Sequence, residues 1–181
     1  MKTVDIDAFC RPGAIQFAVA TLDGWESLRA VLDDLKAEGV EVEVAVMLTA
    51  DARARARACI EAGEPAAGAG SALLDHTVEL RFPSSQELAY CTAGKLADAL
   101  SKRRAQGARN LADALTGWLT HHQAVELHNQ IGRGRLVLWL ELSDPEHRGL
   151  ICGRLVRASI DIVELCSIQL SAREPAVRDR P

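Results

Sequence analysis

The 181-residue sequence has no C-x-x-C pair, no long apolar run and few aromatic side chains. Its five cysteines are widely separated, which argues against a disulfide framework and a thiolate zinc site, so we expect reduced and mostly buried thiols. No stretch approaches the roughly 20 consecutive apolar residues of a membrane span. Asp5 and Asp7 stand where a signal peptide is basic and then apolar. These absences predict a cytoplasmic protein without a membrane partner.

The charge of the chain argues against nucleic acid as a partner. The formal net charge is −4, which gives no overall attraction to phosphate backbones. With one Tyr and three Phe, the sequence also lacks the aromatic stacking surface of a single-strand binder. We therefore interpret its basic clusters as solvated helix faces. These clusters comprise Arg53, Arg55 and Arg57, then Lys102, Arg103, Arg104 and Arg109.

A strand, a helix and a second strand are predicted in the first part of the chain. Apolar residues alternate over 14–21 and again over 40–48, which is the period of a half-buried strand. Between these strands, Asp23 and Glu26 have the spacing of a capping box at the start of a helix. Together the three elements form a predicted βαβ unit, 14–48.

The same order of elements is predicted near the other end. Alternating leucines over 135–142 predict a strand, after which Asp144 is expected to cap a helix that Pro145 opens. We interpret this second βαβ unit, 135–171, as a repeat of the first. Because crossover units are right-handed, the two units combine into one sheet with both helices on one side. The predicted fold class is therefore α+β, with a ferredoxin-like sheet.

The expected organisation is a single α+β domain, 14–171, in which a mainly helical insertion, 49–134, separates the two units. An N-terminal leader, 1–13, precedes it, and the polar tail, 172–181, is predicted to be disordered. The segments expected within the insertion are a helix over 51–61, a loop over 63–70, a strand over 76–82, a helix from Ser84 to Arg104 with Glu87 in a capping box, and helices over 110–119 and 120–131.

The second unit is predicted to be apolar on both faces. Val137, Trp139, Val163 and Leu165 are expected to share the face opposite the leucines. A large exposed apolar patch is uncommon on a monomer, so either the central helices or a second copy of the chain has to cover this face. These four residues are thus candidate interface residues of a homodimer.

A known family has a similar order of elements. Ala114-Leu115, Trp118-Leu119, Ala124, Leu127 and the segment 131–137, which leads into Asp144, carry the resemblance. In this pattern a helix that ends in glycine enters the strand of a second βαβ unit, and it resembles the bacterial general-stress and low-temperature-induced domain family. The resemblance implies a stress-associated accessory protein and transfers no active-site residue.

Functional side chains are most concentrated between 121 and 129. His121, His122, Glu126 and His128 lie on one predicted helix. His121 and His128 are about 10 Å apart along such a helix, too far to bind one ion, whereas His122 and Glu126 have the i, i+4 spacing of a ligand pair. We treat the four as candidate ligand-binding residues and assign no metal site.

Other motifs give little sign of catalysis. The run 63–70 contains no G-K-[ST], and 132–135 lacks the spacing of a dinucleotide fingerprint, so we predict turns there and no cofactor. Arg133 and Arg135 are candidates for holding an anion at that corner. Ser143 precedes a capping aspartate and has no base beside it in the sequence, so we assign no catalytic residue.

These observations favour a non-enzymatic accessory or stress-associated protein that self-associates. Two alternatives stay open. One is a regulatory module that binds a small-molecule ligand, since a fold by itself does not determine function. The other is a metal-dependent enzyme centred on His122 and Glu126.

Overall fold

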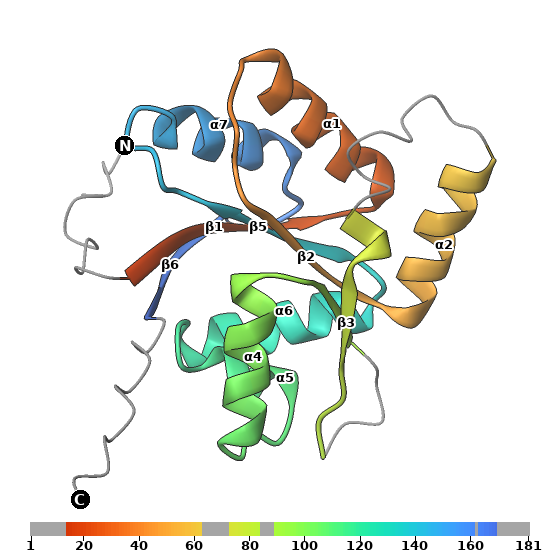
Figure 1. Ribbon diagram of the computed structural model, residues 1–181, viewed down its shortest axis with the longest axis vertical. Helices are drawn as coiled ribbons and strands as arrows, with labels where there is room; N and C mark the ends of the chain where they lie inside the picture. The colour runs from red at the N-terminus through yellow and green to blue at the C-terminus, as the bar shows by residue number, and fades with distance from the viewer. Residues whose placement is uncertain (1–13, 63–72, 84–88, 162, 170–181) are drawn as a thin grey trace, which may run out of the picture.

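A computed structural model of the chain describes residues 14–62, 73–83, 89–161 and 163–169. They form a six-stranded antiparallel sheet with helices on both faces (Figure 1), which confirms the α+β class. The expectations for the leader 1–13, the loop 63–70 and the tail 172–181 lie outside the described residues.

The strand order of the sheet is β3-β4-β2-β5-β1-β6, and every neighbouring pair is antiparallel. β1 and β2 therefore run parallel to each other on either side of β5, as β5 and β6 do on either side of β1. The prediction that the two ends of the chain share one sheet is confirmed, because β5 pairs with both β1 and β2. The strands are β1 Ala14–Leu22, β2 Val44–Thr49, β3 Thr77–Leu80, β4 Ala89–Thr92, β5 Leu136–Glu141 and β6 Glu164–Gln169.

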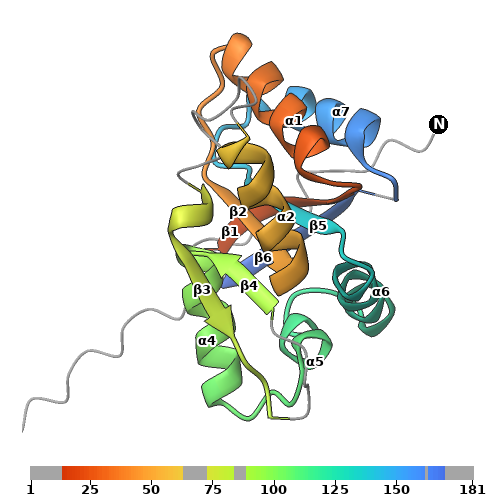
Figure 2. The ribbon, with the colours of Figure 1, turned by 90° about the vertical axis from the view of Figure 1, so that its right-hand side faces the viewer.

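The helices form two groups, one on each face of the sheet. Figure 1 shows α1 and α7 on one face and α4, α5 and α6 on the other, and Figure 2 shows α2 between α1 and α6. Within the described ranges, no helix is long and apolar enough to cross a membrane. The helices are α1 Trp25–Ala37, α2 Ala50–Glu61, α4 Lys95–Ala105, α5 Leu111–Leu115, α6 His121–Gly132 and α7 Arg148–Ala158.

Two of the predicted helix starts are wrong. The N-cap of α1 is Gly24 and its N-terminus has no side-chain cap, so Asp23 and Glu26 do not form a capping box. The carboxylate of Asp144 accepts from the backbone N–H of Glu146 at 2.9 Å and pairs with His147 at 2.8 Å. These contacts stabilise a turn, and α7 begins only at Arg148.

The predicted helix from Ser84 to Arg104 is replaced by a strand followed by a shorter helix. Ser84 and Glu87 lie outside the described residues, but 89–92 form β4 and α4 begins at Lys95. β4 pairs with β2, and the Thr92 hydroxyl accepts from the backbone N–H of Val46 at 3.0 Å. The pairing satisfies backbone groups along β2 that would otherwise stand at a sheet edge, and this outweighs the local capping signal.

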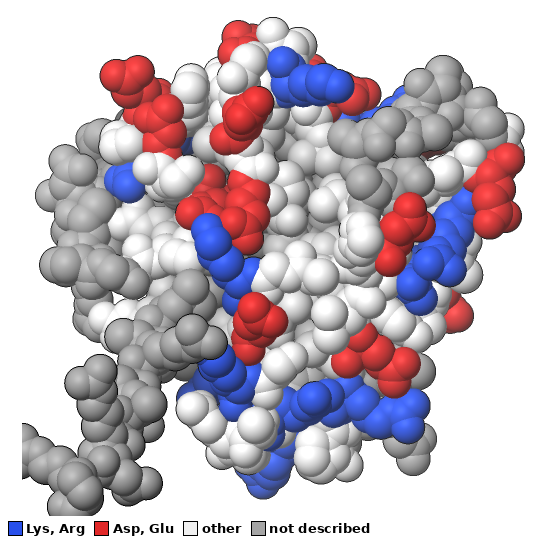
Figure 3. Space-filling model, in the orientation of Figure 1, with Lys and Arg blue, Asp and Glu red and all other residues white. Residues whose placement is uncertain are grey.

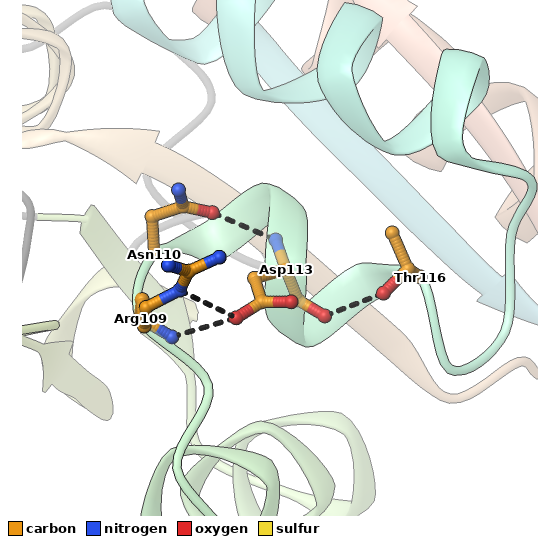
Figure 4. Close-up of polar contacts among 4 residues, drawn as sticks. All are labelled: Arg109, Asn110, Asp113 and Thr116. Carbon is orange, nitrogen blue, oxygen red and sulfur yellow. Dashed lines mark hydrogen bonds and ion pairs between the residues drawn. The ribbon is translucent and has the colours of Figure 1, made fainter.

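α5 is shorter than the predicted helix over 110–119 because polar contacts close both of its ends (Figure 4). At the start, the side chain of Asn110 accepts from the backbone N–H of Asp113 at 2.7 Å. The Asp113 carboxylate in turn accepts from the backbone N–H of Arg109 at 2.9 Å. At the end, the Thr116 hydroxyl donates to the carbonyl of Asp113 at 2.7 Å, and the chain leaves the helix.

The sheet is apolar on both faces, as predicted, and each face has its own core. Leu136, Leu138 and Leu140 pack with α1, α2 and α7, whereas Val137 and Trp139 pack with α4, α5 and α6. Trp139 is 0% exposed, and its ring meets Phe17 edge-on with centroids 6.0 Å apart. The central helices therefore cover this face within a single chain.

The expected interface set is divided between the two faces. Val163 and Leu165 pack with the leucine core, so the prediction that they share a face with Val137 and Trp139 is wrong. The register of β6 decides the face, because Leu165 pairs with Ala18 of β1, which lies in the leucine core, whereas Cys166 pairs with Phe17 in the other core. Since Val137 and Trp139 are fully buried in the chain, a second copy cannot contact them, and self-association stays a prediction.

A cluster of three charged side chains joins the first turn of α4 to the sheet. The ammonium of Lys95 lies 2.7 Å from the carboxylate of Glu43 and 2.8 Å from that of Glu141. Hydrogen bonds to Glu141 and then to Glu43 raise the pKa of Lys95. Burial opposes ionisation of Glu43, but the hydrogen bond and charge of Lys95 outweigh it and lower the pKa of that carboxyl.

Replacing Trp139 tests whether this side chain belongs to the core of a single chain. Trp139→Ala is expected to lower the free energy of unfolding by about 3–5 kcal/mol, because it removes a fully buried indole. Urea unfolding at two protein concentrations measures this loss, which should be the same at both. The control is Val156→Ala, since Val156 is 65% exposed. A loss that grows with protein concentration would instead place Trp139 in an interface.

Replacing Lys95 tests the charged cluster. Lys95→Met is expected to lower the free energy of unfolding by about 1 kcal/mol at pH 7. The raised pKa of Lys95 stabilises the fold below its ordinary value of 10.5, and the lowered pKa of Glu43 stabilises it above its ordinary value of 4.5. Both contributions are present at pH 7, and that of Glu43 is lost as the pH falls through its folded pKa.

Urea unfolding between pH 3 and pH 7 should therefore show the Lys95→Met and wild-type curves converging in acid. The matched control is Lys102→Met on the exposed side of the same helix. A difference between Lys95→Met and wild type that persists unchanged to pH 3 would contradict the assignment.

Candidate functional site

Within the described ranges, the histidines of α6 are not brought together with other metal-binding side chains. His121 and His122 are exposed in the first turn of the helix, and His128 is half-buried further along it. Among the described residues, no group of three or more His, Cys, Asp or Glu side chains could hold a metal ion. His122 and Glu126 therefore find no third ligand in this part of the chain.

Glu126 and Arg135 are brought together by Gln130, a residue that the sequence analysis did not select. The Gln130 amide is 3% exposed and donates to Glu126 at 2.6 Å and to Asp161 at 2.8 Å. Its oxygen accepts from Arg135 at 2.6 Å. Because the buried amide is satisfied by these partners, the network holds α6 against the segment that precedes β6. The sequence did give one indication of this role, because Gln130 stands among the apolar positions of a predicted helix.

A glycine turn connects α6 to β5, and α2 lies against it. Gly134 has a φ of +80°, which glycine adopts without strain. The guanidinium of Arg55 donates to the carbonyl of Gly134 at 3.2 Å. A Cβ on residue 134 would stand 2.7 Å from the same guanidinium nitrogen. The backbone conformation therefore favours glycine, and a Cβ here would displace the flexible end of the Arg55 side chain.

The strand registers bring three chain segments together at the same end of the central strands β1, β2 and β5. Leu22 at the end of β1 pairs with Leu136, and Met47 near the end of β2 pairs with Val137. The start of α1, the start of α2 and the turn before β5 consequently meet there. As a result, Asp23 and Arg55, which are about 30 positions apart, line the same site as Gly134, which is about 80 positions after Arg55.

Two hollows lie at this end of the central strands, and both are lined by Arg55 and Gly134. We call the first the α1 hollow; its volume is about 300 Å³ and it lies between α1, α2 and β5. We call the second the α2 hollow; its volume is about 330 Å³ and it lies between the start of α2 and the glycine turn. Besides the shared pair, Asp23, Trp25, Glu26, Cys59 and Leu136 line the α1 hollow, and Thr49, Asp51, Gly132 and Arg133 line the α2 hollow.

Together the two hollows form the Arg55 cleft, and several charges in it lack partners. Within the described part of the chain, Arg55 makes one hydrogen bond and no ion pair. Arg133 lies 3.9 Å from Glu126, which is the limit of an ion pair. Asp23 and Glu26 are exposed and pair with no other described residue. The cleft thus offers an available guanidinium on one side and available carboxylates on the other.

The buried thiols are poor nucleophiles. Burial raises the pKa of Cys91 to about 12, and burial together with the charge of Glu164 raises that of Cys166 to about 12. Burial also raises the pKa of Cys152, although Arg148 opposes it. These side chains are protonated at neutral pH. Cys59 and Cys152 are half-buried, and Cys59 lines the α1 hollow.

The basic clusters are partly engaged within the chain. Figure 3 shows Lys and Arg side chains gathered at the lower end of the molecule, where α4 lies. There Arg103 donates to the carbonyl of Ala114 at 3.4 Å, and Arg109 lies 3.9 Å from Asp113. On α2, the guanidinium of Arg53 lies 4.8 Å from the ring centre of Tyr90. The absence of a nucleic-acid partner stays a prediction.

The structure thus separates the candidate ligand-binding residues. Arg133 lines the Arg55 cleft, whereas Arg135 and Glu126 belong to the Gln130 network. None of the three histidines lines either hollow. Arg55 is exposed, as the prediction of a solvated helix face requires, and it also reaches the turn at Gly134. The small residues beside it on α2, Ala52 and Ala56, are buried and let the helix approach the sheet; they were the sequence signal for this contact.

Replacing Gly134 tests the geometry of the turn. Gly134→Ala is expected to lower the free energy of unfolding by about 1–2 kcal/mol, because a left-handed backbone costs a residue with a Cβ about that much. Urea unfolding measures the change. In the control Gly153→Ala, on α7, the added methyl group meets no atom within 4 Å and should stabilise the helix by up to about 1 kcal/mol. An unchanged stability of Gly134→Ala would contradict the assigned conformation.

Comparisons with known proteins assign no role to the residues of this cleft. No family model, curated protein or solved structure matches the chain. The resemblance to the general-stress and low-temperature-induced family therefore stays a prediction.

Proposed function

We propose that this protein is a non-enzymatic accessory protein that binds a small anionic ligand in the Arg55 cleft. The observation that carries the proposal is the meeting of two hollows at an arginine that makes a single hydrogen bond within the described residues. Hollows of about 300 Å³ have the size of small-molecule sites.

The chemistry of Arg55 supports an anion as the ligand. A guanidinium has five N–H donors in a planar fork that suits a carboxylate or a phosphate. Arg55 gives one hydrogen bond to Gly134, so the remaining donors are available to a ligand. The absence of a side chain at Gly134 lets the guanidinium and the backbone approach each other closely.

Binding is favoured over catalysis by the groups present. The described lining of the cleft contains the guanidiniums of Arg55 and Arg133, carboxylates, hydroxyl groups and the thiol of Cys59, but no imidazole that could act as a base. The thiols of highest pKa, Cys91 and Cys166, lie in the core on the other face of the sheet. A nucleophile with an adjacent base, which covalent catalysis needs, is not assembled among these residues.

The topology supports the proposed architecture. In the order β2-β5-β1-β6, with α1 and α7 on one face, we propose a ferredoxin-like sheet from two βαβ units, to which β3 and β4 add an edge. The cleft then lies where the first unit meets the turn that enters the second. A stress-associated role, a cytoplasmic location and self-association are proposed from the sequence alone.

The proposal predicts that inorganic phosphate protects the cleft in an Arg55-dependent manner. Phosphate should raise the unfolding temperature of the wild type, measured at constant ionic strength, because a ligand that binds only the folded chain stabilises it. Arg55→Gln is expected to weaken binding about tenfold or more, because a hydrogen-bonded charge pair contributes about 1.5–3 kcal/mol.

Arg57→Gln is the matched control, since Arg57 is exposed on the same helix and lines neither hollow. It should bind phosphate as the wild type does. Equal protection of the wild type and Arg55→Gln, or no protection of either, would rule out the proposed site.

A further inference from the structure

The charges of the Arg55 cleft are unevenly distributed, and this limits the ligand beyond its anionic group. Asp23 and Glu26 line only the α1 hollow, whereas Arg133 lines only the α2 hollow, with Arg55 at the boundary. Asp51 also lines the α2 hollow, but the two guanidiniums outnumber it. An anionic group is therefore accommodated better in the α2 hollow.

The carboxylates of the α1 hollow are available as hydrogen-bond acceptors. Asp23 immediately precedes α1 but does not cap it, because Gly24 is the N-cap and no side chain accepts from the first turn. Neither Asp23 nor Glu26 pairs with another described residue. Ionised carboxylates only accept hydrogen bonds, so they select a ligand portion that donates them, such as hydroxyl groups.

The α1 hollow also has apolar side chains in its lining. Trp25, Ala56 and Leu136 contribute to its lining and belong to the core between the sheet and α1. Polar groups beside apolar side chains are typical of sites that orient a small molecule. This combination suits a compact carbon skeleton that carries hydroxyl groups at its rim.

From this asymmetry, and on the basis of the proposed function, we infer that the ligand is a phosphorylated sugar. Its phosphate group binds Arg55 and Arg133 in the α2 hollow. Its hydroxyl groups donate to Asp23 and Glu26 in the α1 hollow. Arg55, which lines both hollows, lies beside the junction of the two portions.

Calorimetric titration of the full chain with ribose 5-phosphate, inorganic phosphate and ribose tests the inference. The wild type is expected to bind ribose 5-phosphate at least about tenfold more tightly than phosphate, since added hydrogen bonds to charged groups contribute about 1.5–3 kcal/mol. Asp23→Asn should reduce this preference severalfold without weakening the binding of phosphate itself. Asp33→Asn, an exposed position further along α1, should leave the preference unchanged.

The alternative results separate the two proposals. Equal, Arg55-dependent affinities for phosphate and ribose 5-phosphate would overturn the sugar portion and leave the anion site intact. A preference that survives in Asp23→Asn and in Glu26→Gln would also overturn it. If none of the probes binds the wild type, the anion site fails and the inference fails with it. Unfolding curves of each variant confirm that the comparison is made on folded protein.

Discussion

The burial of β5 between β1 and β2 is the constraint on which the rest of the structure depends. All side chains from Leu136 to Leu140 are buried, and they alternate between two separate cores. A strand that is apolar on both faces has to be central in its sheet and covered on both sides. The chain supplies that cover itself, with α1, α2 and α7 on one face and α4, α5 and α6 on the other.

The same constraint positions the cleft. α6 leads into β5 through the turn at Gly134, and the Gln130 network fixes the end of α6 against Asp161. The turn therefore cannot move away from the ends of β1 and β2, from which α1 and α2 begin. Arg55 reaches across to the turn because the α2 residues that face the sheet, Ala52 and Ala56, are small and buried. The electrostatic asymmetry of the cleft thus follows from packing.

Sequence patterns were reliable where a strand or helix follows its own periodicity, and failed where another segment decided the outcome. The strands near 14–21 and 135–142 were predicted almost as they occur. The segment 89–92 was assigned to a helix, yet it pairs with β2, a contact between residues 40 or more positions apart. The face assigned to Val163 and Leu165 was wrong because the register of β6 against β1 places Leu165 beside Ala18 in the leucine core.

The sequence by itself determined the α+β class and the apolar character of both faces of the segment 136–140, because each follows from local hydrophobic periodicity. Only the tertiary structure decided which helices cover Trp139, which strands lie beside β2, and that Arg55 meets Gly134. The physical reason is that a cleft is defined by distances between segments remote in the chain. A guanidinium on an alanine-rich helix has the same local pattern whether it faces solvent or a ligand site.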